Sequence, residues 1–136
     1  MPAGYSNTTL AKKLGIKEGF AMAIINQPEH YFDLFSDFPN KTKLNTALKT
    51  NSLDFIHLFC TSRKELIEKA IPCMNALKKI GILWISWPKG SSKITTDLKR
   101  EAIREHLLNI GLVDVKVAAV DEDWSGLKFV YRLKDR

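Results

Sequence analysis

Cysteine, glycine-rich turns and long apolar runs are all scarce in this sequence, and each shortage excludes a class of protein. Only two cysteines, Cys60 and Cys73, occur in 136 residues, too few for a disulfide framework. Both sit among apolar residues, so we expect buried, reduced thiols. No apolar run approaches the roughly 18 residues that span a bilayer, and the first residues lack a secretory pattern. We therefore expect a cytoplasmic protein with no membrane partner.

Charge of one sign is also never concentrated, although the formal net charge is +6 and the pI is near 9.4. No run of five or six like charges occurs, and no basic helix carries interleaved aromatic residues. We therefore do not expect a nucleic-acid partner. A basic balance suits a small anionic ligand equally well. The three histidines lie far apart without metal-ligand spacing, so we expect no metal.

The apolar patterns that are present alternate between strands and helices. The run from Phe20 to Ile25 is short and continuous, as in a strand buried on both faces. Ser62 and Glu65 form a capping box, and the helix that they open contains Pro72, where we expect a kink or restart. Gly126 is expected in a hairpin turn over 121–126. The expected strands are 20–25, a weak edge strand over 41–48, 53–60, 82–87, 113–120 and 127–133, and the expected helices are 8–14, 28–35, 62–80 and 97–110.

This alternation predicts right-handed parallel crossovers with helices on both faces of the sheet. We predict an α/β fold of three layers, Rossmann-like, with a mostly parallel sheet of about six strands and a C-terminal antiparallel hairpin. The length fits one domain over 1–136.

A ligand of such a sheet binds beyond the carboxyl ends of the strands. Ser62 and Arg63 stand there at a helix N-terminus, where free amides favour an anion, and Lys89, Ser91 and Ser92 follow another strand. We predict that these five residues bind a phosphate or carboxylate. The predicted pocket walls are Asn26, Thr61, Trp87 and Trp124. The alternative interpretation is that Ser62 only caps its helix and the lysines are solvated, since no Walker-type spacing occurs.

The second half of the chain resembles the last third of a Rossmann-like methyltransferase domain. The likeness rests on a helix ending in Lys79-Ile80-Gly81, the strand from Ile82 to Trp87, a helix closing on Asn109-Ile110-Gly111-Leu112, and the final hairpin. It implies a cofactor site that needs a glycine-rich turn after the first strand. The sequence has Asn26-Gln27-Pro28-Glu29 there, so we expect no cofactor.

The whole chain also resembles a family of small bacterial proteins, a domain of unknown function. The likeness is carried by Gly4-Tyr5-Ser6, residues 10–16, Thr61-Ser62-Arg63, Trp84 with Trp87-Pro88-Lys89, Thr96-Asp97-Leu98, residues 111–114 and Trp124-Ser125-Gly126-Leu127. It implies a bacterial intracellular protein and no particular activity.

Two functions follow from these observations. We favour a non-enzymatic domain that binds a small anion or a protein partner, because the glycine-rich turn is missing and the expected rim is basic and serine-rich. The alternative is a transferase-like enzyme that binds a nucleotide-type ligand at the carboxyl ends of the strands. No catalytic residue is assigned, because no nucleophile and base stand at a supporting spacing.

Overall fold

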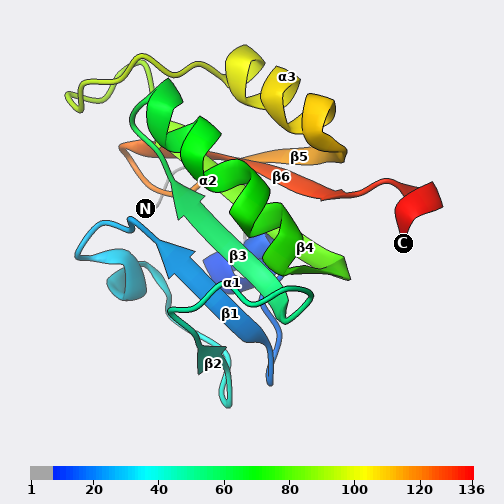
Figure 1. Cartoon of the computed structure of the whole chain (residues 1–136). Coiled ribbons are helices and arrows are strands. Elements are labelled where there is room, and N and C mark those ends of the chain that lie inside the picture. The colour runs from blue at the N-terminus through cyan, green and yellow to red at the C-terminus, as the bar shows by residue number, and fades with distance from the viewer. Residues whose placement is uncertain (1–7) are drawn as a thin grey trace.

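The apolar run after Gly19 forms strand β1 (Ala21–Ile25), which lies second in a six-stranded sheet of order β2-β1-β3-β4-β6-β5. The structure, a computed structural model, describes residues 8–136 (Figure 1). The other strands are β2 (Lys43–Leu44), β3 (Leu53–Phe59), β4 (Leu77–Pro88), β5 (Leu112–Ala119) and β6 (Trp124–Tyr131). The first four strands run parallel, and β6 lies antiparallel to both β4 and β5. The predicted α/β fold is confirmed, with a mixed sheet that is mostly parallel.

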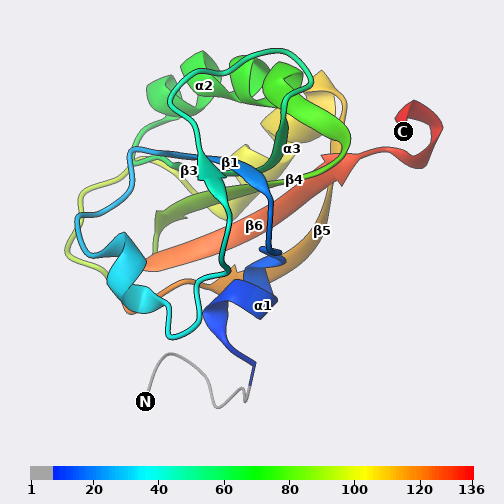
Figure 2. The ribbon, with the colours of Figure 1, turned by 90° about the horizontal axis from the view of Figure 1, so that it is seen from below.

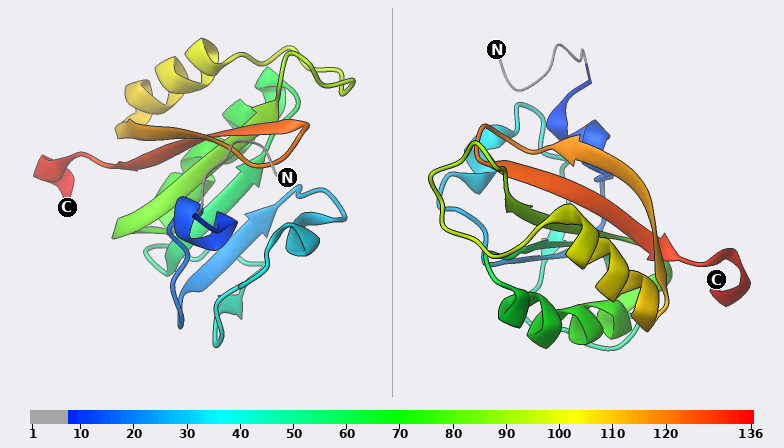
Figure 3. Two further views of the ribbon diagram at one scale, coloured as in Figure 1. Left: turned by 180° about the vertical axis from the view of Figure 1, so that it is seen from behind. Right: turned by 90° about the horizontal axis from the view of Figure 1, so that it is seen from above.

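Helices and turns cover both faces of the sheet. The helices α2 (Arg63–Ala76) and α3 (Arg100–Ile110) lie on one face, and the short helix α1 (Leu10–Leu14) and the 3₁₀ turn η1 (Tyr31–Leu34) lie on the other (Figure 2). Figure 3 shows α2 and α3 side by side above the sheet. A last 3₁₀ turn, η2 (Leu133–Asp135), ends the chain.

The core beneath α2 and α3 is mainly aliphatic, because the alternate residues of β3 and β4 that face the helices are mostly Ile and Leu. Ile56 and Leu58 of β3 and Leu83 of β4 are fully buried in it. Cys60 and Cys73 belong to this core as free thiols, and burial raises the pKa of each thiol to about 12. Both cysteines are therefore protonated at neutral pH.

The opposite face of the sheet is aromatic. Trp84 of β4 is fully buried there, and its indole Nε1 donates a hydrogen bond of 2.7 Å to the carbonyl of Leu14 at the end of α1. Phe55 and Met22 complete this cluster. The hydrogen bond places α1 against the sheet and satisfies the polar atom that a buried tryptophan carries.

The boundary between α2 and β4 differs from the prediction. Helix α2 runs through Pro72 as one element but ends at Ala76, four residues early, and β4 begins directly at Leu77. Leu77 pairs with Leu53 of β3, and its side chain is fully buried. Residues 77–81 therefore adopt an extended strand conformation, and Gly81 lies within β4 rather than directly after the helix.

The hairpin turn is also shorter than predicted. Strand β6 begins at Trp124, so Gly126 lies inside the strand, where it pairs with Ser86 of β4. A Cβ atom at Gly126 would lie 2.9 Å from Cε3 of Trp84. The glycine therefore serves close packing between β6 and the Trp84 ring rather than a turn.

Two further expectations change. Helix α3 begins at Arg100 rather than Asp97, and the edge strand is only Lys43–Leu44. The one or two helical turns expected over 28–35 are the single 3₁₀ turn η1. Thr9 caps α1. The expectation of no secretory segment and the likeness carried by Gly4-Tyr5-Ser6 lie outside the described residues. Within residues 8–136, no helix is long and apolar enough to cross a membrane.

Candidate functional site

The carboxyl ends of the parallel strands meet at one edge of the sheet, as the sequence predicted. Residues 26–30 follow β1, Thr61 and Ser62 follow β3, and Lys89 follows β4. Asn26 is exposed and adopts a left-handed conformation with φ of 59°. The loop between β4 and α3 runs along the same edge.

A groove of about 650 Å³ lies beneath that loop, and we call it the β4–α3 groove. Its positive charges are Lys89, Lys99 and Arg100, and its acidic groups are Asp97 and Glu101. Helix α3 begins in this groove, at an N-cap, Lys99, that makes no side-chain capping bond. The full lining is Trp87, Pro88, Lys89, Gly90, Ser92, Ile94, Thr95, Thr96, Asp97, Leu98, Lys99, Arg100 and Glu101.

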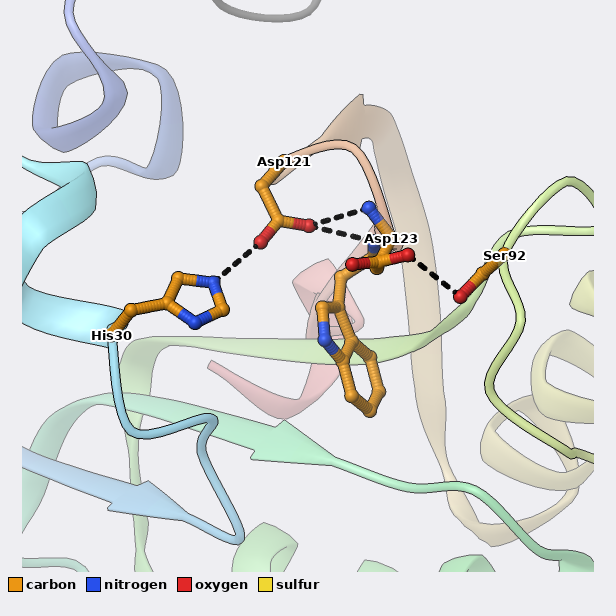
Figure 4. A network of polar contacts seen from close by, with 5 residues as sticks. His30, Ser92, Asp121 and Asp123 are labelled. Atoms are coloured by element: carbon orange, nitrogen blue, oxygen red, sulfur yellow. Dashed lines mark hydrogen bonds and ion pairs between the residues drawn. The ribbon is translucent and has the colours of Figure 1, made fainter.

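Polar contacts from the β5–β6 turn hold the start of the β4–α3 loop (Figure 4). The Ser92 hydroxyl donates to Asp123 Oδ1 at 2.8 Å, and the Lys89 amide donates to the Asp123 carbonyl at 2.8 Å. Asp121 Oδ1 accepts from the amides of Asp123 and Trp124, and its Oδ2 lies 2.9 Å from His30 Nε2. The sequence predicted a turn over 121–126 but not these contacts, because nothing in the local pattern indicates a partner 91 residues away.

The N-terminus of α2 is capped by the chain itself. Ser62 Oγ accepts from the Glu65 amide at 3.2 Å, and Glu65 Oε1 accepts from the Thr61 amide and hydroxyl at 2.9 Å. The Arg63 amide donates to Asp97 Oδ1 at 2.8 Å. The Asp97 carboxylate therefore sits at the start of α2, and Lys99 rather than Asp97 is the N-cap of α3.

The predicted site residues fall into different places. Lys89, Ser92 and Trp87 line the β4–α3 groove, and Ser91 is exposed on the same loop. The side chain of Arg63 instead lines a second hollow, between α2 and α3. The structure thus does not gather the five predicted anion-binding residues around one point, and anion binding stays a prediction.

The predicted pocket walls also divide. Trp87 is 9% exposed in the groove, whereas Trp124 is buried on the other face with its ring 5.0 Å from that of Phe59. Thr61 is partly buried, and its carbonyl accepts a hydrogen bond of 2.7 Å from the Thr96 hydroxyl. This bond and the one to Asp97 tie the β4–α3 loop to α2.

A buried polar chain that the sequence did not reveal lies on the aromatic face. Tyr31 Oη is 2.9 Å from His57 Nδ1, and His57 Nε2 is 2.7 Å from Ser86 Oγ. All three residues are fully buried, and burial lowers the pKa of His57 to about 3 and raises that of Tyr31 far above its usual value. The side chains of Tyr31, His57 and Ser86 are therefore all uncharged at physiological pH, and their hydrogen bonds fix η1 to β3 and β4.

The turn after β1 does not fit the cofactor that a methyltransferase resemblance implies. No glycine stands in residues 26–30, so the backbone lacks the tight turn through which amides approach a ligand. Tyr31, one residue further, is directed into the core against Phe59 and His57 rather than leaving space above the strand. No reaction step is assigned to that cofactor here.

A metal site finds no support either. Among residues 8–136, no group of three or more His, Cys, Asp or Glu side chains is placed to hold an ion. His30, His57 and His106 have separate surroundings: His30 pairs with Asp121, His57 with Tyr31 and Ser86, and His106 lines a hollow between α2 and α3.

Comparison with known proteins identifies the fold. No family model and no curated protein matches the sequence, so the domain-of-unknown-function resemblance stays a prediction. Among solved structures, a SAM-dependent methyltransferase from Aquifex aeolicus covers 88% of this chain and 86% of its own, with 15% identity and a TM-score of 0.66. A ribosomal protein L11 methylase from Lactobacillus delbrueckii covers 90% and 75%, with 11% identity and a TM-score of 0.59.

The same fold carries different chemistry among these neighbours. The cyclase SpnF covers 88% of this chain and 77% of its own, with 11% identity and a TM-score of 0.52. A likeness at such identities fixes the architecture and not the reaction. The chain has a methyltransferase-like fold.

Proposed function

We propose that this chain is a transferase-like domain that binds a nucleotide-type anion in the β4–α3 groove. The observation that carries the proposal is the groove itself, about 650 Å³ at the carboxyl edge of the sheet, with Lys89, Lys99 and Arg100 on its walls. This volume falls within the roughly 300–1,000 Å³ of small-molecule sites. In open α/β sheets, ligands bind at that edge.

The groove offers two kinds of contact that a nucleotide needs. Its three cationic side chains suit a phosphate, and the start of α3 adds the positive end of an eleven-residue helix that has no side-chain cap. Trp87, Ile94 and Leu98 add apolar surface for a base. The methyltransferase-like fold of the neighbours favours a transferase over other enzyme classes.

The second candidate is a non-enzymatic domain that binds a small anion or a protein. It is supported by the turn after β1, which lacks glycine, and by Tyr31, which is fully buried beside it. Both candidate functions use the β4–α3 groove, and they differ in whether the groove recognises the nucleobase of a nucleotide.

A thermal-shift series tests the proposal with ADP, inorganic phosphate and citrate as probes. A ligand that binds only the folded state raises the melting temperature. We expect ADP to bind more tightly than phosphate. Lys89→Ala and Arg100→Ala should each weaken ADP binding about tenfold, because each removes a charge-assisted hydrogen bond.

Lys93→Ala is the matched control. Lys93 is an exposed lysine of the same loop that does not line the groove, so its loss should leave the affinity unchanged. Equal shifts from phosphate and ADP would favour the non-enzymatic candidate. No shift with any probe, or equal losses in Lys93→Ala and Lys89→Ala, would contradict the groove as the site.

A further inference from the structure

A second hollow, of about 210 Å³, lies between α2 and α3. We call it the α2–α3 hollow. Helix α2 supplies one wall and α3 supplies the other, so side chains from the two helices face a common space. The lining is Arg63, Leu66, Ile67, Ala102, Glu105, His106 and Asn109.

Opposite charges stand on the two walls without meeting. Arg63 belongs to α2 and Glu105 to α3, and both side chains are exposed. Within residues 8–136, neither side chain has an ion pair or a hydrogen bond. The hollow therefore presents one free cation and one free anion to whatever enters it.

A buried polar atom of α3 is also unsatisfied. His106 Nε2 is inaccessible to solvent and has no hydrogen-bonding partner within residues 8–136. Buried polar atoms of native proteins nearly always have a partner, because leaving one unpaired is costly. Because solvent does not reach this atom, a ligand in the hollow would not contact it either, and the site rests on Arg63, Glu105 and the aliphatic surface.

The remaining lining is aliphatic. Leu66 is buried at the base, and Ile67 is 58% exposed although it is a large apolar side chain. Contact with a hydrocarbon group would remove the Ile67 surface from water, which is favourable in proportion to the apolar area buried. Charge of both signs and aliphatic surface therefore occur together.

We propose that the α2–α3 hollow binds a free α-amino acid with an aliphatic side chain. The carboxylate pairs with Arg63, and the ammonium group pairs with Glu105. The hydrocarbon packs on Ile67 and Leu66. Size agrees, because a cavity of about 150 Å³ accommodates benzene and this hollow is larger. The proposal stands independently of the nucleotide site.

Titration calorimetry of the full chain with three probes tests the assignment. L-leucine carries both charges, 4-methylpentanoate lacks the ammonium group, and 3-methylbutylamine lacks the carboxylate. We expect saturable binding of leucine and about tenfold weaker binding of each analogue, since each loses one charge-assisted contact.

Two substitutions assign the contacts. Arg63→Gln should abolish the preference for leucine over 3-methylbutylamine, and Glu105→Gln should abolish the preference over 4-methylpentanoate. Lys64→Gln and Glu68→Gln are the controls, because both are exposed charges of α2 that do not line the hollow. Melting curves check that each variant folds.

Three results would overturn the proposal. One is no saturable binding of leucine at millimolar concentration. Another is equal affinity for leucine and both analogues, which would mean that the hollow recognises neither the carboxylate nor the ammonium group. The third is a loss of affinity in the control variants as large as in Arg63→Gln and Glu105→Gln.

Discussion

His57 is the residue whose surroundings most change its chemistry. Burial lowers its pKa from the ordinary 6.5 to about 3, so the native state keeps a neutral imidazole while the unfolded chain protonates near pH 6.5. Between these values the unfolded state binds more protons. The contribution of His57 to the free energy of unfolding is therefore fully present above about pH 6.5 and is lost as the pH falls toward 3.

Replacing His57 should flatten this dependence. Between pH 7.5 and pH 5, we expect the wild-type chain to lose about 2 kcal/mol more free energy of unfolding than His57→Gln, measured by urea denaturation at each pH. A His57→Gln slope equal to that of the wild type would show that His57 does not titrate on unfolding.

The sequence placed His57 within the expected strand 53–60 but did not reveal its partners. Tyr31 and Ser86 lie 26 and 29 residues away, and only the parallel pairing of β3 with β4 and the docking of η1 bring them together. Long-range contacts of this kind leave no local pattern.

At the level of elements, the packing of β6 on β4 depends on Gly126. We expect Gly126→Ala to lower the free energy of unfolding by about 1–3 kcal/mol, because the added Cβ meets the Trp84 ring at 2.9 Å in a closely packed core. Urea denaturation measures the change. Gly90→Ala is the matched control, since a Cβ there meets nothing within 4 Å, and a loss as large as that of Gly126→Ala would refute the packing argument.

The turn between β5 and β6 rests on Asp121. Asp121→Ala removes the acceptor of two backbone amides and the partner of His30, so we expect a loss of about 1–2 kcal/mol. Faster hydrogen exchange at the amides of Asp123 and Trp124 should accompany it. Glu122→Ala, in the same turn but exposed, should leave both quantities unchanged, and equal behaviour of the two variants would argue against this role.

The positions of strands and helices were predictable where the apolar residues recurred at a clear period. The predicted boundaries were wrong where pairing between strands outweighed the local sequence pattern. Strand β3 was expected over 53–60 and observed over Leu53–Phe59. Residues 77–80 continue a helical pattern in sequence, yet Leu77 pairs with Leu53 of β3 and begins β4. Asp97 has the character of an N-cap for α3, but it accepts instead from the Arg63 amide of α2.

At the level of the whole molecule, the fold was predictable from the sequence, whereas the candidate site was not. The alternation of strands and helices sufficed to predict a mixed α/β sheet with a final hairpin, because that alternation admits few topologies. The site did not follow, since the groove is formed by a loop whose course depends on Asp97, Thr96 and Ser92 reaching distant partners. Lys99 and Arg100 were therefore missed as groove residues. A signal was available in the two adjacent cations at the start of α3.

Amide chemical-shift mapping with ADP tests the central claim most directly. The account predicts that the largest shift changes follow the lining of the β4–α3 groove, over residues 87–101, and that Arg100→Ala weakens them without altering the rest of the spectrum. Changes centred on residues 26–31 would instead place the ligand at the turn after β1 and contradict the account. The absence of any change at saturating ADP would contradict nucleotide binding altogether.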